Sequence, residues 1–160
     1  MKTFTFAKLT AFAVSALIAV GAQAETTLEK IKRTGTVTVG TEAAFPPFEF
    51  VENGKIVGYG KDILDYIIAD LGVELVQLDL PWQGILPGVL AGKFDFVATT
   101  VSVRPERAKT YAFTVPIAEG TTWVMKRKGD DSITKVDDIA GKVVSAQLSS
   151  GGQAAAEDFE

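Results

Sequence analysis

A cluster of hydrogen-bonding residues follows one apolar stretch of this sequence. The apolar residues 94–98 lead into the hydroxyls of Thr99 and Thr100, then to Ser102 and, within a short helical pattern, to Arg107. Hydroxyls and free backbone N–H groups at a strand end, beside a planar guanidinium that can donate two hydrogen bonds at once, suit a carboxylate. The pattern predicts a carboxylate site centred on Arg107, and leaves open whether the bound molecule is only held or also transformed.

Hydrophobic periodicity and turn residues predict the elements that position this cluster. The expected strands cover 36–40, 74–78 and 94–98, and the expected helices cover 61–71, 85–90 and 104–109. The prolines within 45–48 predict a rigid extended loop, Asn53-Gly54 predicts a hairpin turn, and Pro81-Trp82 predicts a second loop. Such a β-α-β-α-β series favours a parallel sheet with crossover helices.

The sequence changes character after Phe113. We expect strands at 121–126 and 143–146, a short helical turn at 137–141 and a helix that begins at Gln153. These elements indicate that a second α/β lobe begins in this part of the chain and is not completed.

The N-terminus has the pattern of a secretory signal peptide. Lys2 and Lys8 precede the apolar run Leu9–Val20, whose 12 residues are too short to span a bilayer, and Ala22-Gln23-Ala24 fits a signal-peptidase site. We therefore predict export with cleavage after Ala24. A short membrane anchor is the alternative interpretation.

Composition narrows the classes of function. The sequence contains no cysteine and no histidine, which excludes disulfides, thiolate metal sites and a Ser-His-Asp triad. The formal net charge of −4, without a basic stripe, argues against a nucleic-acid partner. No motif suggests a metal or an organic cofactor, so we expect none.

A set of short motifs, in this order, resembles the family 3 solute-binding proteins, the periplasmic receptors for polar amino acids in bacterial ABC importers. The motifs are Val39–Glu42, Phe45–Phe50, Gly54-Lys55, Gly58-Tyr59, Pro81–Pro87, Gly92–Asp95, Ser102–Lys109 and Asp138–Val144. Four places depart from the family pattern. Thr100 replaces the usual glycine two residues before Ser102, and Gly151 stands where many members have threonine. Gly60 and Lys61 replace an acidic and an aliphatic residue in a motif that we interpret as scaffold, and Arg104 replaces a helix-capping threonine.

The resemblance implies an α/β fold of the periplasmic binding protein-like type II class, with two lobes joined by a hinge and the ligand between them. After the signal peptide at 1–24, the first lobe would cover 25–113, the hinge region 114–122 and the start of the second lobe 123–160. Because the chain is shorter than typical members, we expect a C-terminally truncated fragment whose second lobe is incomplete.

The resemblance also implies roles for the residues of the cluster. Arg107 would bind the α-carboxylate of an amino acid, and Ser102 would add its N–H and hydroxyl. Thr100 would accept from the α-ammonium through its carbonyl or hydroxyl. Phe45 and Trp82 would lie on either side of the ligand's side chain, although core packing is an equal interpretation for Trp82.

Three further residues are candidates with open alternatives. Glu42, at the carboxyl end of the first strand, could meet a distal cationic group, or could be solvated or paired with Arg104. Ser150 and Gly151 would close onto the α-carboxylate from the start of the last helix, or form only an ordinary helix cap.

The leading functional prediction is a non-enzymatic transport receptor. It would bind a small amino acid and interact with an inner-membrane ABC permease, as a monomer, with no nucleic acid and no stable membrane insertion after cleavage. A periplasmic cyclohexadienyl dehydratase on the same fold is the enzymatic alternative, with Glu42 or Glu119 as acid or base. A sensory ligand-binding domain is a third possibility.

Overall fold

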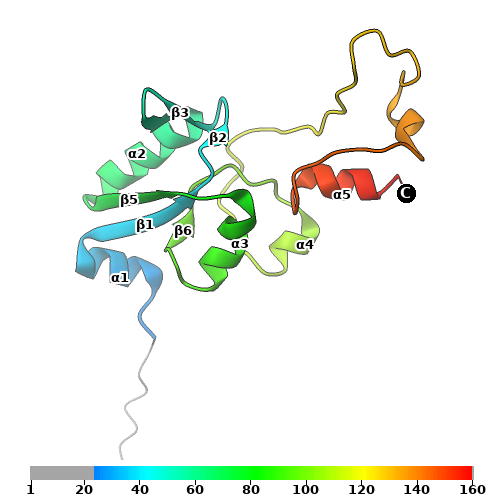
Figure 1. Cartoon of the computed structure of the whole chain (residues 1–160). Coiled ribbons are helices and arrows are strands. Elements are labelled where there is room, and N and C mark those ends of the chain that lie inside the picture. Colours follow the sequence, from blue (N-terminus) through cyan, green and yellow to red (C-terminus); the bar gives the residue numbers. More distant parts are fainter. Residues whose placement is uncertain (1–23, 160) are drawn as a thin grey trace, which may run out of the picture.

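The computed structural model describes residues 24–159, so the predicted signal peptide, apart from Ala24, lies outside the described residues. An α/β unit occupies the N-terminal part, and the chain after it extends away before returning with its last helix beside α4 (Figure 1). Within 24–159, no helix is long and apolar enough to cross a bilayer.

A three-stranded parallel sheet forms the centre of the α/β unit. Its strands are β1 (Thr36–Thr41), β5 (Glu74–Asp79) and β6 (Phe96–Val97), in the order β5-β1-β6. β1 pairs with β5 along its whole length, and Val39 is aligned with Phe96 of β6. The parallel sheet predicted from the sequence is confirmed. The regular part of the third strand is shorter than predicted, although its backbone continues to follow β1 through the hydrogen bond from Asp95 N–H to the Thr38 carbonyl.

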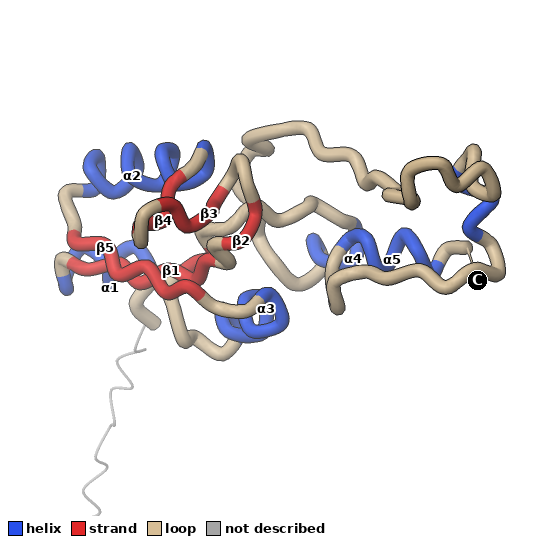
Figure 2. Tube along the Cα trace, turned by 45° about the horizontal axis from the view of Figure 1, so that its top comes forward, coloured by secondary structure: helices blue, strands red, loops and turns tan. Residues whose placement is uncertain are grey.

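Helices cover both faces of this sheet. α2 (Tyr59–Leu71) and α3 (Trp82–Leu90) lie on opposite sides, as right-handed crossovers to the two neighbours of β1 require (Figures 1 and 2). The predicted loop at Trp82 is wrong, because Trp82 is the first residue of α3 and Pro81 is its N-cap. One apolar cluster joins β1, α2 and the preceding helix, and it consists of Ile31, Val37, Val39, Leu64 and Ile68.

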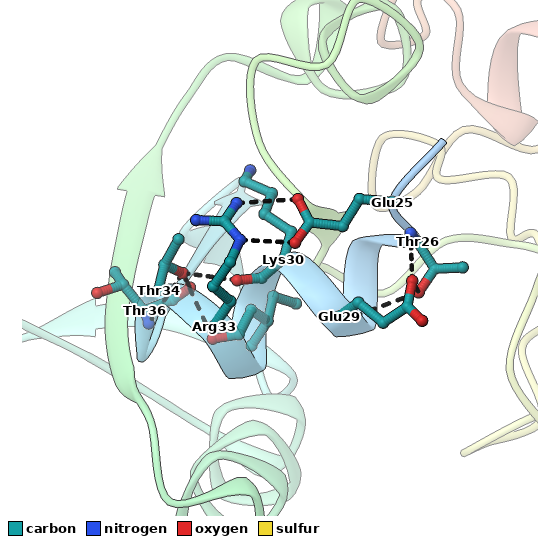
Figure 3. A network of polar contacts seen from close by, with 8 residues as sticks. Glu25, Thr26, Glu29, Lys30, Arg33, Thr34 and Thr36 are labelled. Carbon is teal, nitrogen blue, oxygen red and sulfur yellow. Dashed lines mark hydrogen bonds and ion pairs between the residues drawn. The ribbon is translucent and has the colours of Figure 1, made fainter. Parts of the chain in front are cut away.

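The helix α1 (Thr27–Thr34) leads into β1 and has strong end signals. Thr26 and Glu29 form a capping box, and Gly35 ends the helix in a left-handed conformation at φ 68°. Arg33 donates two hydrogen bonds to the carboxylate of Glu25, at 2.7 and 2.9 Å (Figure 3). These local interactions fix the entry of the chain into the central strand.

Between β1 and α2 in the sequence, the chain forms a small antiparallel sheet. It comprises β2 (Ala44–Phe45), β3 (Glu49–Glu52) and β4 (Lys55–Val57). The predicted hairpin is confirmed: Asn53 at φ 51° and Gly54 at φ 74° are both left-handed, as a two-residue turn of this kind requires. The expectation that Phe45 stays outside any sheet is wrong, because it pairs with Glu49 at the edge, where the following prolines do not interrupt a ladder.

The chain after Phe113 contains little regular structure. The short helix α4 (Pro105–Ala108) precedes it, and the 3-10 helix η1 (Val136–Ile139) and α5 (Gly151–Glu157) lie within it. The strands predicted at 121–126 and 143–146 are not formed. A strand is stable only beside another strand, and in the described part of the chain neither segment has one.

Candidate functional site

Arg107 lies on α4, directly after the loop that follows β6. Its guanidinium donates to the carbonyl of Ser102 at 3.2 Å and to the carbonyl of Ser149 at 3.0 Å. The same group lies over the indole of Trp82, 5.3 Å from the ring centroid, in a cation–π arrangement. Partial burial lowers the pKa of Arg107, and the positive charge of Arg104 lowers it further. The side chain is thus held in place by three segments of the chain.

The indole ring of Trp82 lies against the guanidinium of Arg107. Its exposed fraction is 7%, so it packs in the α/β unit and also presents its ring face to Arg107. Phe45 is different, since 46% of it is exposed and its ring stacks on Phe48 at a centroid distance of 5.5 Å. The role of the two aromatic residues as walls on either side of a ligand stays a prediction.

The two threonines after β6 contact a buried carboxylate that the sequence analysis gave no role. Thr100 Oγ1 donates to Glu49 Oε1 at 2.8 Å, and Thr99 Oγ1 donates to Glu49 Oε2 at 3.2 Å. Glu49 is only 2% exposed. A β-carbon at position 60 would collide with Glu49 Oε1, so the glycine that departs from the family pattern leaves the space that this carboxylate fills.

Residues from the C-terminal part approach the same region. Glu42, just beyond β1, accepts a hydrogen bond from Gln147 Nε2 at 2.7 Å. Ser150 caps α5, because its hydroxyl accepts from the N–H of Gln153 at 3.1 Å. A β-carbon at Gly151 would lie 3.7 Å from the hydroxyl of Ser102, which is exposed. Glu42 therefore has a side-chain partner other than Arg104.

A cavity of about 290 Å³ lies between α4 and α5. Its lining includes Arg104, Arg107, Ser149, Ser150 and Gln153. Arg104 is the N-cap of α4 without a side-chain cap hydrogen bond, as the departure from threonine predicts. The structure thus brings Arg107, Ser102, Ser150 and Gly151 together at one end of the α/β unit, with Trp82 beneath and Glu42 linked through Gln147.

Three contributors escaped the sequence analysis: Glu49, Gln147 and Ser149. Glu49 stands inside a motif that carries the family resemblance, and a carboxylate on the inward side of a hairpin strand was the available signal. For Gln147 and Ser149 the sequence offers only polar residues near a predicted helix start. Within residues 24–159, no group of three or more potential metal-ligating side chains is arranged around one point. The arrangement can hold an anionic group at Arg107 and a hydrogen-bond donor at the threonines.

The model of the bacterial extracellular solute-binding proteins, family 3, matches residues 37–156, a range that includes every predicted site residue. The chain belongs to this family. The solved structures that this chain resembles confirm the predicted type II periplasmic binding protein-like fold class.

Several relatives illustrate the likeness. The L-cystine-binding protein TcyJ of Escherichia coli is 32% identical over 123 residues, which are 76% of this chain and 46% of that protein. The P235GK mutant of ArgBP from T. maritima matches with a TM-score of 0.78 and 34% identity, over 84% of this chain and 59% of that one. The ancestral amino acid-binding protein AncCDT-1, a precursor of cyclohexadienyl dehydratase, matches with a TM-score of 0.74 and 33% identity, over 84% of this chain and 61% of that one. The chain spans about half the length of the curated relatives it matches.

Proposed function

We propose that this protein is a periplasmic receptor of an ABC importer, which binds a polar amino acid between two lobes and delivers it to an inner-membrane permease. The observation that carries the proposal is the guanidinium of Arg107, which lies over Trp82 and reaches carbonyls on both Ser102 and Ser149. A guanidinium held in this way can bind a carboxylate, because its planar fork can donate two parallel hydrogen bonds to the two carboxylate oxygens, which also carry the opposite charge.

The proposal includes the two-lobe division. The first lobe would comprise 25–113, a hinge region 114–122, and the second lobe would begin at 123. Support comes from Gln147 and Ser149, which belong to the second segment and contact Glu42 and Arg107 of the first. The names of the relatives support the amino-acid ligand class, and the signal-peptide pattern at 1–24 supports export to the periplasm.

The test is a thermal-shift screen of the full chain against the twenty amino acids, ornithine and citrulline. A ligand that binds only the folded state raises the melting temperature in proportion to the logarithm of its concentration over Kd. We expect at least one amino acid to do so, and Arg107→Ala to lower its affinity by about 10- to 100-fold through loss of the charged hydrogen bonds. Arg107→Lys keeps the charge without the planar fork and should recover only part of the affinity.

The control is Arg33→Ala, which removes an exposed arginine whose side chain pairs with Glu25 on α1's side of the molecule (Figure 3). It should leave the ligand response intact. Arg107→Ala should also fold, because the carbonyl partners at Ser102 and Ser149 belong to exposed residues and can bind water instead. An undiminished response in a folded Arg107→Ala variant would remove Arg107 from the site, and no response of the unaltered chain to any amino acid would overturn the proposed function.

The second candidate function is a cyclohexadienyl dehydratase, favoured by the likeness to AncCDT-1. Such an enzyme needs a positioned acid or base near the leaving group. Of the two candidates, Glu42 is hydrogen-bonded to Gln147 and Glu119 is exposed in the irregular chain. Incubation with prephenate or arogenate, followed by ultraviolet absorbance, decides between the two functions. Turnover of either compound would show that the protein is an enzyme and would overturn the receptor function.

A further inference from the structure

Glu49 is an unusual feature of the α/β unit. A carboxylate that is removed from water normally has a cationic partner, because burial of an unpaired charge is costly. Glu49 is 2% exposed, and within residues 24–159 no lysine or arginine nitrogen lies within ion-pair distance of its carboxylate. Its side-chain oxygens instead accept from two hydroxyls, those of Thr99 and Thr100.

The chemical consequence concerns the direction of the two hydroxyl protons. A threonine hydroxyl has one proton to donate and lone pairs to accept with. Thr100 gives its proton to Glu49, and Thr99 gives its proton to Glu49 or, at the longer distance of 3.5 Å, to the carbonyl of Glu42. With its proton engaged in this way, each hydroxyl oxygen presents only lone pairs to any other molecule. The negative charge behind them strengthens their attraction for a cationic donor.

These two acceptor hydroxyls lie close in the sequence to the residues that surround Arg107. Thr99 and Thr100 directly follow β6, and Ser102, whose carbonyl contacts Arg107, is two residues further along. The guanidinium side of the site attracts anions, and the threonine side attracts donors. In the proposed receptor, a zwitterion would place its carboxylate at Arg107 and its ammonium at the threonines.

The departure at position 60 fits the same arrangement. A β-carbon there would enter the space that Glu49 Oε1 now occupies, so glycine at position 60 allows the carboxylate this position. The motif that resembled simple scaffold in the sequence therefore has a second role, since it makes room for a buried charge.

We propose that Glu49 is a positioning residue that sets ligand specificity: it orients the hydroxyls of Thr99 and Thr100 as acceptors and so selects ligands with an ammonium group beside the carboxylate. The inference rests on the proposed function and deepens it. Glu49 acts through the threonines and does not itself touch the ligand.

The test compares pairs of probes in the full chain. Each amino acid that shifts the melting temperature is paired with the same carboxylic acid lacking the α-amino group; for L-arginine this partner is 5-guanidinopentanoic acid. In Glu49→Gln, the NH₂ group of the glutamine donates a hydrogen bond to one of the two threonine hydroxyls. That hydroxyl must then direct its own proton away from position 49, so it faces the ligand as a donor. We expect the affinity for the amino acid to fall about tenfold or more, and that for the des-amino acid to change by less than about twofold.

Two further variants separate positioning from structural support. Thr100→Val removes one acceptor while keeping the shape, and should reproduce the selective loss even if Glu49→Gln does not fold. Glu52→Gln alters an exposed carboxylate on the same strand, β3, and should leave both affinities unchanged.

The outcomes distinguish this inference from the proposed function. If the unaltered chain responds to no amino acid, the proposed function fails. If it responds, but Glu49→Gln and Thr100→Val weaken both members of a probe pair equally or weaken neither, the receptor function stands and the role of Glu49 is overturned.

Discussion

Replacing Gly88 with alanine tests the packing that holds α3, and with it Trp82, against the sheet. The ring of Phe94, 4% exposed, lies between β1 and α3. A β-carbon at Gly88 would lie 2.6 Å from Cε1 of this ring, and one at Gly40 would lie 2.5 Å from its Cζ. Carbon atoms pack at about 3.5–4.0 Å, so the ring or the helix would have to move by roughly 1 Å.

Two effects oppose each other in this variant. Alanine is a better helix former than glycine by about 1 kcal/mol, which favours the substitution. Overpacking of a core costs about 1–3 kcal/mol, and the ring of Phe94, 4% exposed, lies close to a glycine on each side. The packing cost therefore wins, and Gly88→Ala should lower the free energy of unfolding by up to about 2 kcal/mol.

Gly84 provides a matched control in the same helix. Nothing lies within 4 Å of a β-carbon at this position, so Gly84→Ala should be neutral or stabilising. The two variants should differ by about 1–3 kcal/mol in urea unfolding followed by circular dichroism. Phe94→Leu, which narrows the side chain, should be less harmful in combination with Gly88→Ala than alone. A Gly88→Ala chain as stable as Gly84→Ala would refute the role assigned to the ring.

Two other predictions concern stability and solvent exposure. Burial of the Asp95 carboxyl opposes its ionisation, but the hydrogen bonds from Lys30 and the Thr38 N–H outweigh burial and lower its pKa. The ionised Asp95 carboxylate then stabilises the fold fully at pH values above the pKa of an unfolded aspartate, about 3.9, and this stabilisation is lost as the pH falls through the lower pKa of the folded state. The midpoint of urea unfolding should therefore fall less steeply between pH about 6 and 3 in Asp95→Asn than in the unaltered chain. Trp82 is 7% exposed and Trp123 is 82% exposed, so acrylamide should quench the fluorescence of Trp82→Phe fully and that of Trp123→Phe weakly; equal quenching would contradict the placement of both.

Local patterns predicted most of the α/β unit, but not α1, the start of α3 at Trp82 or the pairing of β2. The valines of β1, the two-residue turn at Asn53-Gly54 and the left-handed glycine that ends α2 each depend on residues within a few positions, so the sequence predicts them well. The same patterns predicted strands at 121–126 and 143–146, which are not formed. Their β propensity is real, but a strand also needs a neighbour, and propensity does not supply one.

The candidate site was predictable only in part, because its key contacts join distant positions. Arg107 and the hydroxyls after β6 are close in sequence, and the motif revealed them together. Glu49 meets Thr100 across 51 positions, and Glu42 meets Gln147 across 105. No periodicity connects such pairs. Sequence reasoning therefore found the residues that share one loop and missed the carboxylate that orients them.

In the proposed receptor, the hydrogen bonds of Arg107 would connect ligand binding to movement of the second segment. One N–H group of its guanidinium already contacts the Ser149 carbonyl, so a ligand carboxylate would compete with a backbone oxygen of the second segment. The guanidinium–carbonyl hydrogen bond has one charged partner, whereas a ligand carboxylate is charged as well and can accept two parallel N–H bonds from the guanidinium, so the exchange favours the ligand. The released carbonyl can turn to water, since Ser149 is exposed, while Gly151 stays beside the hydroxyl of Ser102. In the proposed receptor, the contact that holds the segment near Arg107 before binding is thus the one that the ligand replaces.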